Sequence, residues 1–240
     1  MIKIVMPLIF SLFLSTSLFA EEKSPWSHES EASVVSVDGN TTSDSYSAKQ
    51  KTSYKFDTNV LKVTARYLRT KSDSTETARQ WEASLRYEKE FSDLWSAFIQ
   101  HGAESDSYAG YTQRDSTDIG GKYFFVKTDD KNFFSEAGLR YQKTLSSSDG
   151  ETTNSTMGRL YLEYNEKFSE TVSGKMWVEY LPNFSDSYAY LLNGEPSVSV
   201  MMNQIFSLKV AYLVKYHNLI SSSTEKRTDT MFTTALVAKF

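Results

Sequence analysis

Apolar and polar residues alternate along most of the chain beyond residue 28. Between Phe206 and Tyr216 every even-numbered residue is apolar or aromatic, whereas the odd-numbered positions include Ser207, Lys209 and Lys215. Successive side chains of a β-strand point to opposite faces, so this segment predicts a strand with one apolar and one largely polar face. The same alternation marks the segments at 61–68, 81–88, 133–141, 159–164, 172–180 and 231–240.

Weaker alternation fills the remaining sequence and brings the expected total to about twelve strands. The weaker segments lie near 29–38, 45–56, 94–104, 115–127 and 184–200. Pro196 interrupts the last of them, because proline cannot donate to a strand ladder. Short connections lie at 57–58, 92–93, 128–130, 169 and 201–203. Longer polar loops lie near 39–44, 70–78, 105–114, 144–153 and 218–227, with a shorter one near 181–186. Bacterial outer-membrane barrels show this alternation of short turns and longer loops.

Charges on the polar face separate a membrane barrel from a soluble β-protein. A secreted antiparallel β-protein, the alternative, would bury its apolar face in a core and expose its charges. A membrane barrel turns the apolar face to lipid and the polar face to the lumen. Nearly every strand carries such charges, so we predict an all-β fold, a single transmembrane antiparallel β-barrel. The expected lumen charge network is Lys62, Arg66, Glu82, Arg86, Glu136, Arg140, Arg159, Glu163, Lys175 and Glu179.

Aromatic residues near the strand ends predict two girdles at the membrane interfaces, where amphipathic rings are favoured. If the first strand runs outward, the outer ring contains Tyr67, Tyr141, Tyr180 and Tyr216. The periplasmic ring contains Tyr87, Trp95, Phe133, Tyr164, Phe206 and Phe240. An even number of strands places both chain termini in the periplasm. The terminal Phe240 resembles the assembly signal of bacterial outer-membrane proteins, which implies the barrel-assembly machinery as a partner.

The first twenty residues predict a cleavable signal peptide. Lys3 precedes an apolar run from Ile4 to Leu14, and Ala20 is a small residue at the expected cleavage site. An uncleaved anchor helix is the alternative, but the run is short for crossing a bilayer. The expected organisation is a signal peptide at 1–20, a short periplasmic segment at 21–28 and the barrel at 29–240.

Composition narrows the possible functions. The chain has no Cys, which excludes a disulfide-stapled fold, a thiol nucleophile and a Cys-ligated metal. Its formal net charge of −4 gives no basic excess for nucleic-acid binding. The mean hydropathy of −0.45 argues against a helical membrane bundle. We expect no cofactor, a monomer, and outer-membrane lipid and lipopolysaccharide as partners.

Several short stretches resemble a known family. The segment from Glu31 to Thr41 (EASVVSVDGNT) is similar to the family's opening motif of small and apolar residues followed by Gly-Asn-Thr. Thr228-Asp229-Thr230 and Lys239-Phe240 match at the other end. In this order, over roughly 29–240, the chain resembles the domain-of-unknown-function family 481, the salt-induced outer-membrane proteins. It departs at Asp38, where the family often has Ser. The resemblance implies an outer-membrane barrel with no established activity, so no catalytic residue is carried over.

Candidate catalytic groups are few. His28 and Ser30 share one strand face, as in a His/Ser dyad, and His101 precedes Glu104 and Asp106. The alternative, non-catalytic interpretations are a solvated strand start for His28 and Ser30 and a polar loop for Glu104 and Asp106. His217 is not part of a recognised catalytic motif and is expected at the membrane interface. With only three dispersed His, a transition-metal site is not expected.

Two other features have a structural and a functional interpretation. Gly120-Gly121 lacks the Lys and helix of a phosphate-binding loop and predicts a strand kink or a close contact in the lumen. Acidic loop residues are either a solvated rim or ligands for divalent cations that bridge to lipopolysaccharide. These residues are Asp44, Asp73, Glu76, Asp106, Asp115, Asp149 and Glu151.

The sequence therefore favours a non-catalytic outer-membrane barrel of structural or narrow-channel type, with a link to osmotic or salt adaptation implied by the family resemblance. The alternatives are an outer-membrane lipid hydrolase or protease and a loop-mediated surface receptor or adhesin. A His within hydrogen-bonding reach of Ser or Asp at the outer rim would favour the enzyme.

Overall fold

The computed structural model describes residues 24–37, 43–186, 188–219 and 227–240. Within these residues the chain forms twelve β-strands and one short 3-10 helix, η1 (Ser107–Ala109). The strands are β1 (Trp26–Val37), β2 (Ser43–Phe56), β3 (Asn59–Ser72), β4 (Thr75–Glu90), β5 (Trp95–Asp106), β6 (Tyr111–Lys127), β7 (Lys131–Ser146), β8 (Thr152–Lys167), β9 (Val172–Pro182), β10 (Tyr190–Met201), β11 (Phe206–His217) and β12 (Thr228–Lys239).

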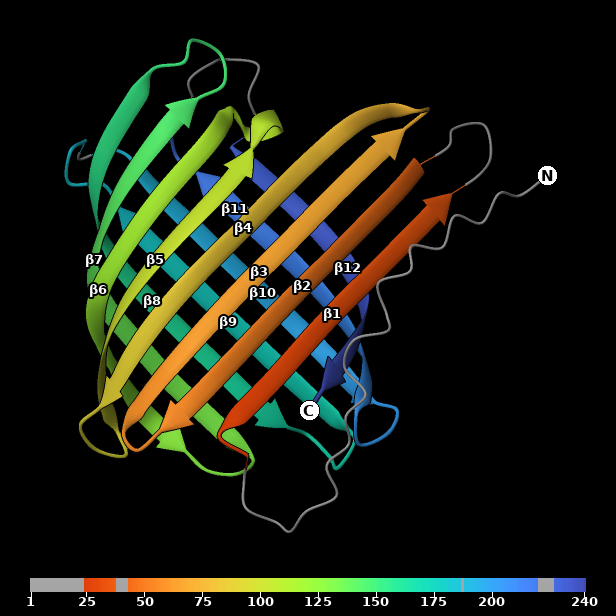
Figure 1. Ribbon diagram of the computed structural model, residues 1–240, viewed down its shortest axis with the longest axis vertical. Coiled ribbons are helices and arrows are strands. Elements are labelled where there is room, and N and C mark those ends of the chain that lie inside the picture. Colours follow the sequence, from red (N-terminus) through yellow and green to blue (C-terminus); the bar gives the residue numbers. More distant parts are fainter. Residues whose placement is uncertain (1–23, 38–42, 187, 220–226) are drawn as a thin grey trace.

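The strands form one closed antiparallel barrel in which each strand pairs with its neighbours in sequence. Strand β1 closes the barrel by pairing with β12. All strands are inclined to the barrel axis (Figure 1). Strand β1 begins where β12 ends, and His28 donates a backbone hydrogen bond to the Phe240 carbonyl at 2.7 Å. We call this end of the barrel the turn end and the opposite end the loop end. The predicted all-β barrel of twelve antiparallel strands is confirmed.

Apolar side chains cover the outside of this barrel. Leu85 and Leu139 are 55% and 51% exposed, and Leu160 and Leu208 are exposed as well. Inward-facing Arg86 and Glu136, which alternate with them along the same strands, are only 8% and 4% exposed. The usual arrangement of a water-soluble protein is therefore inverted. An outward apolar wall and an inward polar one are what a barrel in lipid requires.

Several strands are longer than the sequence pattern predicts. The expected loop at 70–78 is wrong, because β3 and β4 meet at a two-residue turn, Asp73 and Ser74, whose φ angles are both positive. Similarly, only residues 107–110 separate β5 from β6, and only 147–151 separate β7 from β8. Where a strand extends beyond the apolar band of the outer surface, both of its faces carry polar residues. The alternation that marks a strand is therefore absent from the sequence there.

Two boundaries also differ from expectation. The first strand begins at Trp26, inside the segment expected to precede the barrel. The strand expected at 184–200 begins only at Tyr190, because Asn183 and Asp186 form side-chain hydrogen bonds to backbone N–H groups in the preceding turn. Pro196 lies inside β10, and neither it nor Glu195 is paired with β11. Proline thus interrupts one ladder without ending the strand.

The expected signal peptide at 1–20, residues 21–23 of the segment at 21–28 and the Gly39-Asn40-Thr41 motif lie outside the described residues, as does most of the loop at 218–227. In the part of the chain that is described, there is no helix of the length and apolar character needed to cross a membrane.

The outward apolar face and the inward polar face can be tested by arginine substitutions at two adjacent positions. Leu208 points outward from β11 and Ser207 points inward. Leu208→Arg should impair folding into liposomes by about 1–2 kcal/mol, because a lipid-facing arginine is costly in the apolar band, although less so close to the turn-end girdle than at the bilayer centre. Ser207→Arg should cost far less, since its guanidinium meets a polar lumen. Equal folding yields for the two variants would show that the faces are assigned incorrectly.

Candidate functional site: the ion-pair cluster inside the barrel

Oppositely charged side chains meet in the barrel interior near mid-height. Arg86 on β4 and Glu136 on β7 form a two-pronged ion pair, with Arg86 nitrogens 2.6 and 3.1 Å from the two carboxylate oxygens. Strands β5 and β6 lie between β4 and β7 in the wall, so the pair crosses the lumen side of both. Bidentate contacts of this kind are among the strongest hydrogen-bonded ion pairs.

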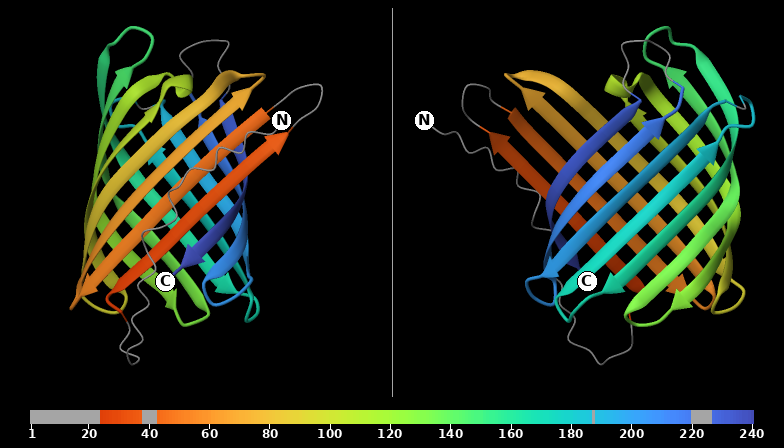
Figure 2. Two further views of the ribbon diagram at one scale, coloured as in Figure 1. Left: turned by 45° about the vertical axis from the view of Figure 1, so that its right-hand side comes forward. Right: turned by 180° about the vertical axis from the view of Figure 1, so that it is seen from behind.

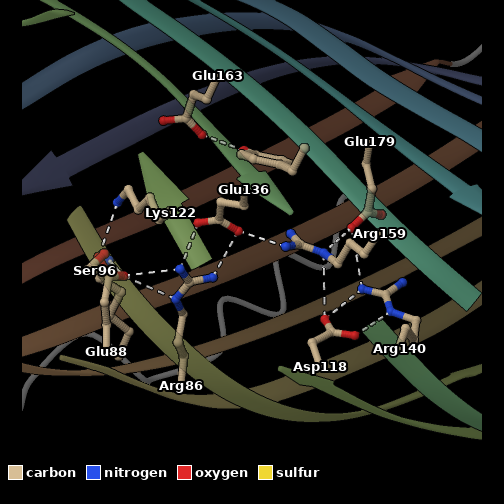
Figure 3. A network of polar contacts seen from close by, with 12 residues as sticks. Arg86, Glu88, Ser96, Asp118, Lys122, Glu136, Arg140, Arg159, Glu163 and Glu179 are labelled. Atoms are coloured by element: carbon tan, nitrogen blue, oxygen red, sulfur yellow. Dashed lines mark hydrogen bonds and ion pairs between the residues drawn. The ribbon is translucent and has the colours of Figure 1, made fainter. Parts of the chain in front are cut away.

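The cluster extends from Glu136 toward β8 and β9. The Glu136 carboxylate also accepts from Arg159 at 2.7 Å, and Arg159 lies 2.7 Å from Glu179. Arg140 lies 2.6 Å from Asp118 and 3.3 Å from Glu179. Figure 3 shows these residues converging from different strands into one connected set.

A second branch is centred on Glu88, which neighbours Arg86 on β4. Its carboxylate lies 3.1 Å from Arg86, 3.2 Å from Lys62 and 3.4 Å from Lys122, and it accepts a hydrogen bond from Ser96 at 2.8 Å. We call the nine ionised residues joined in this way the central cluster. They are Lys62, Arg86, Glu88, Asp118, Lys122, Glu136, Arg140, Arg159 and Glu179.

Most of the central cluster is shielded from water, although the Lys62 side chain is 28% exposed. Asp118 is 2% exposed, and Glu88, Lys122 and Arg159 are also buried. Among the described residues, every buried side-chain nitrogen or oxygen has a hydrogen-bond partner. Burial of charge is costly unless each charge is paired and hydrogen-bonded. Five cations and four carboxylates in contact meet that requirement with little net charge.

An inward-facing aromatic ring supports the cluster from the wall. The Arg86 guanidinium lies 3.8 Å from the centre of the Phe98 ring, in cation–π geometry. Phe98 itself lies against Gly120, where an added Cβ would come within 3.0 Å of the ring and 2.5 Å of the Ala137 carbonyl oxygen. Gly120 faces Gly138 in the β6–β7 ladder. Gly120 therefore provides space for Phe98, whereas Gly138 permits close approach of the backbone, because its added Cβ would come within 2.3 Å of the Ile119 carbonyl oxygen.

Further inward aromatics continue this layer toward the turn end. The Lys122 ammonium lies 4.5 and 4.2 Å from the centres of the Phe124 and Phe134 rings. Tyr161 stacks between Phe134 and Trp177, at ring distances of 6.0 and 5.9 Å. The lumen is thus not uniformly polar: its charges rest on an aromatic layer.

Part of the opposite side of the interior is apolar. Ala211 and Leu213 on β11 and Ala235 and Val237 on β12 point inward and are buried, and Val237 is only 2% exposed. Buried inward side chains therefore lie on both sides of the lumen.

The structure brings together six of the ten predicted lumen charges, namely Lys62, Arg86, Glu136, Arg140, Arg159 and Glu179. Glu163 and Lys175 form a separate pair at 2.8 Å. Arg66 donates to the neutral Gln80 at 3.1 Å. Glu82 lies in a loop-end cavity with Arg66, Glu104, Asp106 and Lys215.

The ten residues of the predicted lumen charge network do not include Glu88, Asp118 or Lys122. Glu88 continues the even-numbered series of Glu82 and Arg86, so the strand period already indicates its face. Asp118 and Lys122 lie on the same face of β6, on either side of Gly120. Because Gly120 and Gly121 have no side chains, the sequence does not show which face of β6 is polar at this point. Of the two interpretations of Gly120-Gly121, the geometry favours a close contact in the lumen.

The aromatic residues expected at the two interfaces point outward near opposite strand ends. Trp95 and Phe240 at the turn end are 55% and 58% exposed, and Phe133 contacts Tyr164 at a ring distance of 6.3 Å. The remaining turn-end positions are Tyr87 and Phe206, and the loop-end positions are Tyr67, Tyr141, Tyr180 and Tyr216. Tyr190, which the sequence reasoning omitted, lies between Tyr180 and Tyr216 at ring distances of 5.6 and 5.9 Å.

The candidate catalytic groups engage other partners. His28 contacts the Thr52 hydroxyl at 3.1 Å, whereas Ser30 donates to the Gln50 amide oxygen at 2.5 Å. His101 contacts the Thr117 hydroxyl at 2.9 Å. Among the described residues, His28 forms no hydrogen bond with Ser30, and His101 forms none with an acidic residue.

Several acidic residues of the loops serve local structure. Asp106 accepts hydrogen bonds from the backbone N–H groups at the start of η1, and Glu76 lies 2.8 Å from Arg69. Asp149 accepts from the Glu151 N–H at 2.9 Å. Within the described residues, no three His, Asp or Glu side chains are grouped as a metal site would require.

Comparisons with known proteins agree with this architecture. The profile of the family described as "Protein of unknown function, DUF481" matches residues 30–240. The uncharacterized protein YdiY of Escherichia coli (strain K12) is 27% identical over 222 residues, which are 90% of this chain and 84% of that protein.

Two solved structures share the fold. The COG4313 outer membrane channel from Pseudomonas putida F1 has a TM-score of 0.53 at 10% identity, over 89% of this chain and 93% of that one. The NanC porin has a TM-score of 0.52 at 10% identity, over 88% and 97%. One neighbour is named an outer membrane channel and the other a porin, and the likeness to this chain is one of fold.

The contact of Gly120 with Phe98 predicts that alanine is more destabilising at Gly120 than at the adjacent Gly121. Gly120→Ala should lower the free energy of unfolding by about 1–3 kcal/mol, because the new methyl group overlaps backbone and ring atoms. Gly121→Ala is the matched control, since its Cβ would lie 3.9 Å from the nearest contact. Urea unfolding of the two folded variants measures the difference, and equal midpoints would contradict the packing described.

The position of Glu136 between Arg86 and Arg159 predicts a large effect of removing its charge. Glu136→Gln leaves two buried guanidinium groups without their shared carboxylate, which should cost roughly 3 kcal/mol of unfolding free energy. Glu82→Gln changes an inward carboxylate outside the central cluster and should cost less than about 0.5 kcal/mol. A small effect at Glu136, comparable with that at Glu82, would show that the cluster is not an energetic unit.

Proposed function

The chain belongs to the DUF481 family of proteins of unknown function, and from that premise and the geometry of its interior we propose that it is a non-catalytic outer-membrane barrel of narrow-channel type, closed at rest by the central cluster. The single observation that carries the proposal is the nearly complete burial of Arg86, Glu136 and Arg159 inside a barrel whose outer surface is apolar.

The outer surface supports a location in lipid. Exposed leucines and valines form its middle band, and aromatic side chains lie toward both ends. Such a surface would make the barrel insoluble in water and stable in a bilayer, where a closed sheet satisfies its backbone hydrogen bonds internally. We place both chain termini and the turn end in the periplasm, with the loop end outside, as an even strand number and periplasmic entry require.

The interior supports a closed or very narrow passage. Permeating ions or solutes would have to separate Arg86 from Glu136 or displace the aromatic side chains beneath them. Because neither sign of charge dominates the central cluster, any passage through it should discriminate weakly between cations and anions. The structural neighbours named above are channels, which is consistent with a channel that needs a trigger or a rearrangement to open.

The proposal includes partners and context. We propose that the protein works as a monomer in contact with outer-membrane lipid and lipopolysaccharide, after insertion by the barrel-assembly machinery through a signal that includes Phe240. A role in osmotic or salt adaptation follows from the family resemblance. Catalysis is not part of the proposal, because Ser30 donates its hydroxyl proton to Gln50 and has no hydrogen bond to His28.

The conductance of the refolded protein in planar bilayers tests this proposal. The wild-type protein should show small or rare openings. The triple change of Arg86, Arg140 and Arg159 to Ala should raise the single-channel conductance and shift selectivity toward cations, because Asp118, Glu136 and Glu179 remain without those partners.

A matched control removes three cations outside the central cluster, Arg66, Lys175 and Arg69, and should leave the conductance near the wild-type value. A large, stable wild-type conductance that the central triple change leaves unaltered would contradict the proposal. The charges would then line an open pore, and a general porin would be the better description.

A further inference from the structure

Strands β1 and β12 pair along only part of their length. Their facing residues run from Glu29–Lys239 to Ala32–Leu236, and the ladder ends there. Beyond this point, residues 33–37 pair with β2 and residues 228–235 pair with β11. Figure 2 shows β1 and β12 together at the turn end and diverging toward the loop end. We call this boundary the seam, and among the described strands it is the part of the wall with the shortest ladder.

The hydrogen-bond pattern shows which backbone groups the diverging edges leave without a ladder partner. His28 and Phe240 exchange both of their backbone hydrogen bonds, at 2.7 and 3.1 Å. Because hydrogen-bonded and non-hydrogen-bonded pairs alternate in an antiparallel ladder, the even-numbered residues of β1 direct their N–H and C=O groups toward β12. Val34 therefore faces the edge of β12, where Thr234 would be its partner if the ladder continued in register. Unpaired backbone groups are costly in hydrocarbon, which favours extension of the ladder in a bilayer.

Two ion pairs hold the paired part of the seam. Lys239 lies 3.0 Å from Glu29 directly across it. Lys209 on β11 reaches past β12 to Glu31 on β1 at 3.1 Å, and lies 3.6 Å from Glu195 on β10. The Lys209 and Glu31 side chains are only 15% and 11% exposed, so little water is present to replace their contact. Since Glu31 is next to the last facing pair, the contact of Lys209 with Glu31 holds the end of the ladder, and we call it the latch.

The central cluster does not extend to the seam. Its nine residues lie on β3, β4, β6, β7, β8 and β9, and none lies on β1, β2, β10, β11 or β12. The inward side chains of Ala211 and Val237, next to the seam, are apolar. Separation of β1 from β12 therefore widens the lumen between the central cluster and these apolar side chains without breaking the contact of Arg86 with Glu136.

The lumen beside the seam is more accessible to water than the central cluster. Lys51 on β2 points inward and is exposed. Val35, on the same face of β1 as Glu31, is 48% exposed, whereas Arg86 and Glu136 in the central cluster are 8% and 4% exposed. A widening at the seam therefore enlarges a region that water already reaches.

From these observations we propose that the seam is the gate of the channel and that Lys209 and Glu31 form its latch. The channel opens when the latch breaks and β1, with β2 attached, separates from β12. It closes when the ladder extends in register toward Ser36 and Phe232. The route lies between the central cluster and the apolar side chains of β11 and β12. This inference rests on the proposed channel function and identifies the rearrangement that opens it.

The charges beside the route indicate which solutes it admits. Glu29 faces Lys51 and Glu31 faces Lys49 in the β1–β2 ladder, so both signs of charge lie along it. The gate therefore passes small hydrophilic ions with little preference for either sign.

The latch is tested by Glu31→Gln in the refolded full-length barrel. Loss of the carboxylate charge should raise the frequency of channel openings in planar bilayers several-fold, and Lys209→Met should do the same. Because both changes break one contact, the double variant should open no more often than the stronger single variant. Glu163→Gln is the matched control, since it neutralises an inward carboxylate that lies 2.8 Å from Lys175, away from the seam. Equal opening frequencies of Glu31→Gln and Glu163→Gln would overturn the latch.

A disulfide tests the gate from the opposite direction, and the absence of Cys removes competing thiols. Continued in register, the ladder places Val35 opposite Thr233 in a non-hydrogen-bonded pair, whose close approach suits a disulfide. Oxidised Val35→Cys/Thr233→Cys should open several-fold less often than its reduced form, in both the wild-type and the Glu31→Gln backgrounds. Each single cysteine variant should not respond to oxidation. Val35→Cys/Met231→Cys, two residues out of register on the same face, should form several-fold less disulfide.

Two outcomes would overturn the gate. Absence of a disulfide between the thiols at 35 and 233 in folded barrels would show that the ladder does not extend. A complete disulfide that leaves the openings unchanged would show that the seam does not control the passage. The triple change of Arg86, Arg140 and Arg159 to Ala separates this failure from that of the proposed function. Conductance in the triple variant without any response to the latch or the disulfide overturns the gate alone, whereas silence of every variant overturns the channel as well.

Discussion

Neutralisation of charge inside a membrane-sized barrel is the constraint on which the rest of the structure depends. A strand period of two that turns leucines and valines to lipid turns arginines, lysines and glutamates inward, where little water reaches them. Isolated charges there would be prohibitively costly, so each must meet a partner across the lumen. The contact of Glu136 with both Arg86 and Arg159 is the centre of that solution, because it links strands β4, β7 and β8 into one network.

The aromatic layer and the glycine pair make this network possible. Phe98 occupies the space that Gly120 leaves free and presents its face to the Arg86 guanidinium, and Gly138 allows the backbones of β6 and β7 to approach closely. The charges therefore pack against rings rather than against an open cavity. On the opposite wall, Ala211, Leu213, Ala235 and Val237 form an apolar patch beside the ion pairs of Lys209 with Glu31 and Glu195.

Sequence reasoning reached the barrel and its two faces because alternation is a local property of each strand. The partners in the central cluster are not local. Arg86 and Glu136 are 50 residues apart and meet through the curvature of the wall, which neighbouring residues do not encode. Asp118 and Lys122 escaped notice because Gly120-Gly121 removes the side chains that would reveal the period. The incomplete pairing of β1 with β12 could not be predicted either, because strands with equally clear sequence alternation pair over different lengths.

The account's central claim is that inward side chains close the barrel, and thiol accessibility from each side of a liposome tests it most directly. Single cysteines replace Glu82 in the loop-end cavity, Lys175 near the turn end and Ser96 beside Glu88. A small, neutral, membrane-impermeant thiol reagent should modify the first only from the loop end, the second only from the turn end and the third slowly from either. Rapid modification of Glu82→Cys and Lys175→Cys from both sides would contradict the claim, because the reagent would then have passed through the central cluster.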